Sequence, residues 1–95
     1  MSVRIVIAED EAIIRLDLRE TLEEEGYEVV GETGRGDHAV DLVRELRPDL
    51  AILDIKMPHT DGIAAARMIS GEHLCAVLIL TAFSQKEVVD EACNA

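Results

Sequence analysis

The chain has very few aromatic residues and few basic ones. Tyr27 and Phe83 are the only aromatics among 95 residues, so a packed core has to be aliphatic. Nine lysines and arginines stand against twenty aspartates and glutamates, which gives a formal net charge of −11. This balance argues against a nucleic-acid or anionic-membrane surface on the chain itself.

Signs of secretion or membrane insertion are also lacking. The two cysteines, Cys75 and Cys93, form no CxxC motif and suggest no disulfide framework, which fits a reducing compartment. The N-terminus has no signal-peptide pattern, and no apolar stretch approaches the length needed to span a membrane. We therefore expect a soluble, cytoplasmic protein.

Aliphatic runs alternate with charged amphipathic segments along the chain. Hydrophobic residues make up 48% of the sequence, enough for one packed domain. Ile14, Leu18 and Leu22 recur at helical spacing, Gly26 is a natural helix stop, and Asp37 is a candidate helix cap. The expected strands are 3–8, 27–32, 50–54 and 76–81, and the expected helices are 11–25, 37–46, one ending near 70 and one opening at 84. Short loops in such an alternation predict an α/β fold with a parallel sheet covered on both faces.

Carboxylates follow two of the expected strands. Glu9 and Asp10 come directly after the first strand, and Asp54 ends the third. Because the carboxyl ends of parallel strands meet at one edge of a sheet, these side chains should converge. The repulsion between two like unit charges about 4 Å apart is about 4 kcal/mol at a typical effective dielectric constant. A bound hard divalent cation is the usual reason for such a cluster.

Each of these residues also has a structural interpretation. Acids such as Glu9, Asp10 and Glu11 stabilise a helix N-terminus, but Asp54 ends a buried strand and caps no obvious helix. An acid at the end of a second strand, Asp54, therefore favours the functional interpretation. Thr81 closes the fourth strand at the same edge, where its hydroxyl could donate to an anion near Asp54; its β-propensity explains its presence equally well.

Three motifs in order carry a family resemblance. Ile-Ala-Glu-Asp-Glu at 7–11, Leu-Asp-Ile-Lys-Met-Pro at 53–58 followed by Asp-Gly at 61–62, and Leu-Thr-Ala at 80–82 resemble the receiver domain of two-component response regulators. The resemblance extends along residues 1–95. It implies a flavodoxin-like, doubly wound parallel sheet with strand order 2-1-3-4.

The resemblance also implies roles for the site residues. Asp54 is expected to be the phosphoacceptor, receiving a phosphoryl group from a sensor histidine kinase. Asp10, supported by Glu9, is expected to bind Mg²⁺ together with Asp54, and the backbone carbonyl of Lys56 is a further expected ligand. Thr81 is the expected switch hydroxyl. The domain would be a signalling module that assists only its own phosphoryl transfer and dephosphorylation, not an enzyme.

The sequence departs from the family pattern after the fourth helix. The fifth strand, which carries a lysine that pairs with the phosphoryl group, and the fifth helix are not found in residues 1–95. We therefore expect a receiver that is incomplete at its C-terminal end, with no catalytic lysine in this chain. An open edge beside the fourth strand would favour a homodimer.

The output and two competing functions stay open at this point. The segments at 25–32 and 81–85 are similar to receivers joined to an RNA-binding antitermination domain, which predicts an output in transcription or antitermination. A degenerate receiver that binds a protein partner without phosphorylation is one alternative. A phosphatase with an aspartyl nucleophile is another, but such enzymes need an acid two residues after the nucleophile, where this chain has Lys56.

Overall fold

The computed structural model describes residues 2–55 and 62–80. Their elements are β1 (Arg4–Ala8), α1 (Ala12–Glu24), β2 (Glu28–Thr33), α2 (Gly36–Leu46), β3 (Leu50–Asp54), α3 (Gly62–Gly71) and β4 (Ala76–Leu80). The strands pair in parallel in the order β2-β1-β3-β4. This confirms the predicted α/β class and strand order. In these ranges no helix is both long and apolar enough to cross a membrane.

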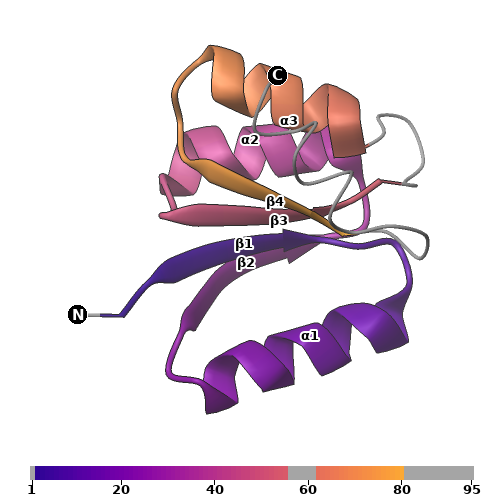
Figure 1. The fold of residues 1–95 in the computed structure, drawn as a ribbon. Coiled ribbons are helices and arrows are strands. Elements are labelled where there is room, and N and C mark those ends of the chain that lie inside the picture. The colour runs from indigo at the N-terminus through magenta and orange to yellow at the C-terminus, as the bar shows by residue number, and fades with distance from the viewer. Residues whose placement is uncertain (1, 56–61, 81–95) are drawn as a thin grey trace.

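The helices cover the sheet from both sides. Figure 1 shows α1 beneath one face and α2 with α3 side by side on the other. Successive side chains of a strand point to opposite faces. Each central strand therefore contributes side chains to two cores, which is why β1 and β3 appear in the sequence as continuous apolar runs.

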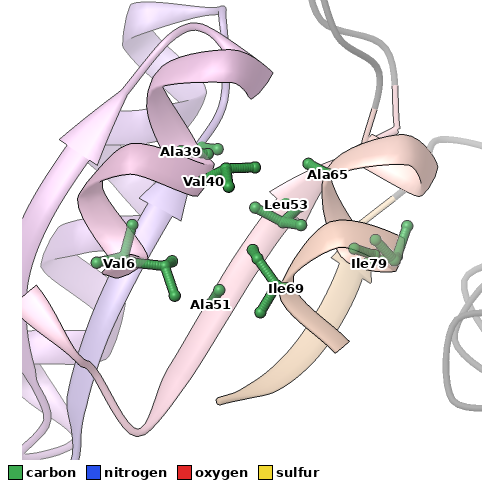
Figure 2. Packing of buried hydrophobic residues seen from close by; sticks show 11 residues of the cluster. Val6, Ala39, Val40, Ala51, Leu53, Ala65, Ile69 and Ile79 are labelled. Atoms are coloured by element: carbon green, nitrogen blue, oxygen red, sulfur yellow. The ribbon is translucent and has the colours of Figure 1, made fainter. Parts of the chain in front are cut away.

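The larger core lies between the sheet and the pair α2 and α3. Figure 2 shows its side chains meeting from both layers. Its fully buried members are Val6, Ala8, Ala39, Val40, Val43, Ala51, Leu53, Ala65, Ala66, Ile69 and Ile79. All of them are aliphatic, as the shortage of aromatics requires. Several are alanines, whose small side chains let the helices lie close to the strands.

The second core, under α1, is thinner. Ile5, Ile7, Val29 and Ile52 are buried there, with Leu18, Leu22 and other half-buried residues packed against them. No residue of α1 is fully buried, and Ile14 keeps 46% of its surface exposed. Two of the three residues in the predicted stripe of this helix therefore contribute to packing.

The predicted stop of α1 is confirmed. Gly26 has φ +92°, a backbone conformation that glycine adopts without a Cβ penalty. Its N–H donates to the carbonyl of Glu23 at 3.0 Å, and the N–H of Tyr27 donates to the carbonyl of Leu22 at 3.1 Å. These two bonds satisfy helix-end carbonyls in the Schellman arrangement.

The predicted cap of α2 is wrong. Arg35 occupies the N-cap position, and no side chain caps the helix. Asp37 is the second residue of the helix, within its first turn, where it accepts two hydrogen bonds from the Arg35 guanidinium at 2.8 and 3.1 Å. These bonds lower the pKa of Asp37 to about 2. The negative charge of Asp37 still stabilises the helix by its interaction with the positive end of the helix dipole, although Asp37 is not the N-cap residue.

Candidate functional site

The sheet register brings the two acidic strand ends to one level. Ala8 of β1 pairs with Leu53 of β3, so the residues that follow them, Glu9 and Asp54, emerge side by side. The backbone N–H of Glu9 donates to the carbonyl of Thr33 at 2.9 Å, which extends the β1–β2 pairing by one residue. Asp10 lies in the turn before α1 and is therefore not held by the sheet.

The predicted convergence of carboxylates is present in the structure. Glu9, Asp10 and Asp54 each offer a carboxylate oxygen, and these oxygens lie within 4.8 Å of one another. The three environments differ: Glu9 is 4% exposed, Asp54 is half-buried, and Asp10 is exposed. The cluster is therefore closed at the sheet and open to solvent on the side of Asp10.

Burial and like charge together disfavour the ionised form of Glu9. Desolvation is the main cause that raises its pKa from 4.5 to about 7, and the charge of Asp54 adds to it. Hydrogen bonds shared with the carboxyl groups of Asp10 and Asp54 act in the same direction. The N–H of Glu11, which donates to Glu9 Oε1 at 3.0 Å, opposes the shift. Without a cation, the cluster tends to retain a proton near neutral pH.

The donor set fits a hard divalent cation. Carboxylate oxygens are the ligands that Mg²⁺ takes in proteins, and Mg²⁺ usually keeps several waters. Three carboxylates within this distance can therefore share one ion, directly or through its waters. No other group of three metal-ligating side chains occurs among the residues that the structure describes.

Two predicted site residues, Lys56 and Thr81, lie outside the described residues. The structure does describe Leu80, the residue before Thr81 and the last of β4. Leu80 pairs with Asp54 in the β3–β4 register, and the carbonyl of Leu80 accepts from the N–H of Ile55 at 3.1 Å.

Gly62, which belongs to the Asp-Gly motif at 61–62, also has a direct structural role. A Cβ on Gly62 would lie 2.2 Å from the carbonyl oxygen of Asp54 and 2.9 Å from the Cα of Ile55. The N–H of Gly62 donates to the carbonyl of Ile55 at 3.1 Å. The start of α3 therefore packs directly on the backbone that carries Asp54, which only a residue without a side chain allows.

Comparison with known proteins identifies the family. The family described as the response regulator receiver domain matches residues 5–95. The chain belongs to this family, and its acidic cluster lies at the carboxyl ends of the sheet strands in a receiver fold.

Individual relatives agree with this assignment. The transcriptional regulatory protein PdtaR of Mycobacterium tuberculosis is 53% identical over 92 residues, and the match covers 97% of this chain but 45% of that protein. The chain thus spans less than half the length of this relative. The chemotaxis protein CheY of Thermotoga maritima is 35% identical over all of this chain and 80% of its own length.

Solved structures give the same result. The signal receiver domain of the response regulator NarL from Mycobacterium tuberculosis superposes with a TM-score of 0.87 at 32% identity, covering 98% of this chain and 77% of that one. The response regulator domain of Thermotoga maritima CheB superposes with a TM-score of 0.85 at 26% identity, covering 99% of this chain and 72% of that one.

Proposed function

We propose that Asp54 accepts a phosphoryl group from the phosphohistidine of a sensor histidine kinase, with Mg²⁺ bound at Glu9, Asp10 and Asp54. The observation that supports this most is the convergence of three carboxylates within 4.8 Å at the strand ends of a receiver-family chain. Uncompensated acids at this spacing repel one another, so a cation explains why they are gathered there.

In the proposed reaction, a carboxylate oxygen of Asp54 attacks phosphorus. The new P–O bond forms as the P–N bond of the phosphohistidine breaks, and the electron pair of that bond stays on the imidazole nitrogen, which takes a proton. Mg²⁺, when bound, offsets the repulsion between the attacking carboxylate and the phosphoryl oxygens. Asp10 and Glu9 supply the negative charge that attracts the cation, and the Lys56 carbonyl is the proposed further ligand.

The product would act as a switch. A phosphoryl group carries about two negative charges and three acceptor oxygens, which is a large local change from one carboxylate. We assign Thr81 as the hydroxyl that donates to this group, so that the surface around β4 repacks. The acyl phosphate is a labile covalent intermediate, which suits a transient signal.

The downstream output is proposed to be control of transcription. The name of the relative PdtaR, a transcriptional regulatory protein, supports this. An RNA-binding antitermination output rests on the similarity of the segments 25–32 and 81–85 to such receivers, and it stays a prediction. The same holds for the cytoplasmic location and for a homodimer.

Phosphoryl transfer is tested by incubating the protein with acetyl phosphate and Mg²⁺ and recording its intact mass. We expect one phosphoryl adduct in the wild type and in Asp17→Asn, a control on an exposed acid of α1, and none in Asp54→Asn. A folded wild type that forms no adduct would favour the phosphorylation-independent binding module. Turnover of a generic phosphate ester would favour the phosphatase.

A further inference from the structure

We propose that Arg15 is a positioning residue for the metal site, acting through the backbone carbonyl of Glu9. The inference rests on the proposed Mg²⁺ site and goes beyond it, because Arg15 belongs to none of the motifs that define that site. Its side chain comes from α1 and reaches back to the turn that carries the acidic pair.

The contact is with the peptide that joins the two acids. Arg15 Nη1 donates to the carbonyl oxygen of Glu9 at 2.6 Å, and the backbone N–H of Arg15 donates to the carbonyl of Glu11 at 2.9 Å. A peptide unit is planar. A bond to the Glu9 oxygen therefore restrains the orientation of the whole unit, up to the Cα of Asp10, and so narrows the directions in which the Asp10 side chain can leave the backbone.

Among residues 2–55 and 62–80, the other hydrogen bonds of the turn hold the neighbouring peptide units. The N–H of Glu9 donates to the carbonyl of Thr33 at 2.9 Å, which fixes the preceding peptide unit. The N–H of Glu11 donates to Glu9 Oε1 at 3.0 Å, which fixes the following one. Arg15 thus supplies the restraint on the middle unit through a side chain that can be changed while all three acids stay in place.

The guanidinium of Arg15 is itself held in position. Its Nε lies 3.8 Å from Glu32 Oε1 at the end of β2, and Glu32 Oε2 accepts from Arg19 Nη1 at 3.0 Å. A Cβ on Gly34 would lie 3.3 Å from Arg15 Nη1, so the loop after β2 closes over this group. The Arg15 side chain is 24% exposed. Its side-chain freedom is therefore already restricted before any ion binds, as preorganisation of a site requires.

A residue that orients a metal ligand without touching the metal affects affinity more than it affects the fold. Loss of such outer partners typically weakens metal binding by about 10- to 100-fold. Asp10 is exposed and is not held by the sheet, so its position depends on the peptide that Arg15 fixes. We expect the lower end of that range, since Glu9 and Asp54 keep their places.

Calorimetric Mg²⁺ titration of the metal-free chain tests the proposal. Arg15→Met keeps the aliphatic stem and removes the donors, and it is expected to weaken Mg²⁺ binding by about tenfold. Arg15→Lys, which retains a donor but loses the fork, is expected to recover part of this loss. Arg19→Met is the matched control, because Arg19 shares Glu32 but does not bond to the Glu9 carbonyl, and it is expected to change affinity by less than about twofold.

A readout without metal accompanies the titration. The N–H groups of Glu9 and Glu11 flank the peptide that Arg15 holds, and loosening that peptide should weaken their hydrogen bonds. Their amide exchange in the metal-free protein should therefore be faster in Arg15→Met than in the wild type and unchanged in Arg19→Met. Wild-type affinity in Arg15→Met, or an equal loss in Arg19→Met, would overturn the role of Arg15. If Arg15→Met does not fold, Arg15→Lys is compared with Arg19→Lys, and equal affinities overturn it.

The same titration distinguishes failure of the metal site from failure of the Arg15 role. A wild type that binds no Mg²⁺ would overturn the proposed metal site and this inference together. A wild type that binds Mg²⁺ while Arg15→Met binds it equally well would overturn the inference alone.

Discussion

Replacing Glu9 by glutamine should stabilise the metal-free protein at alkaline pH. Glu9 is 4% exposed and lies against two other carboxyl groups, and its pKa is raised from 4.5 to about 7, mainly by burial. One pKa unit corresponds to about 1.4 kcal/mol, so ionising Glu9 in the folded state costs about 3 kcal/mol. Glutamine keeps the oxygen that accepts from Glu11 and removes the charge, so we expect a gain of about 2–3 kcal/mol at pH 8.

The sign of the pH dependence follows from the direction of the shift. The folded protein holds the Glu9 proton more tightly than the unfolded chain does. The resulting stability is complete below pH 4.5 and is lost as the pH rises through about 7. The wild type should therefore become less stable between these values, while Glu9→Gln should lack this part of the decline. At pH 8, saturating Mg²⁺ should make the wild type more stable than Glu9→Gln, because the ion binds the folded wild type more tightly than the folded variant.

Urea unfolding followed by far-ultraviolet circular dichroism is the suitable assay, since the chain has no tryptophan. With an m-value of about 1 kcal/mol per molar urea, the gain would raise the midpoint at pH 8 by about 2–3 M. Glu20→Gln, an exposed acid on α1, controls for the change in net charge and should shift the midpoint little. Equal midpoints for Glu9→Gln and the wild type from pH 5 to pH 8 would refute the reasoning.

Three further substitutions test the site and the fold. Asp10→Asn should weaken Mg²⁺ binding by at least about tenfold in a calorimetric titration, and unchanged affinity would remove Asp10 from the ligand set. Gly62→Ala should destabilise the protein by about 2–3 kcal/mol in urea, because its Cβ meets the Asp54 carbonyl, whereas Gly71→Ala has open space and should be neutral or slightly stabilising. Ile69→Ala, at a fully buried position, should cost about 2–5 kcal/mol, while Met68→Ala, at a position 47% exposed, should cost less than about 1; similar losses would contradict the assigned core.

The strand order followed from the family resemblance, but the alternation of apolar runs and amphipathic segments was enough to predict the α/β class and the parallel sheet. It predicted each described strand and helix to within a residue or two, because burial on both faces of a parallel sheet leaves a strong mark on sequence. The meeting of Asp10 and Asp54 was predictable for the same reason, since parallel strands end at one edge. Neither inference needed a contact between particular side chains.

Long-range contacts explain what the sequence could not reveal. The proximity of Gly62 to the Asp54 carbonyl and the bond from Arg15 to Glu9 depend on how helices sit on the sheet, and local spacing does not encode that. The same is true of the difference in burial between the neighbours Glu9 and Asp10. The capping role expected of Asp37 was wrong because Arg35, two residues earlier, binds its carboxylate instead.

The proposed acceptor of the phosphoryl group is the carboxylate of Asp54, beside Glu9 and Asp10. Borohydride reduction after treatment with acetyl phosphate and Mg²⁺ converts a phosphorylated aspartate to homoserine, which peptide mass spectrometry can locate. We expect homoserine at position 54, formed only with Mg²⁺. Homoserine at position 10 or at any other aspartate, with position 54 unchanged, would contradict it.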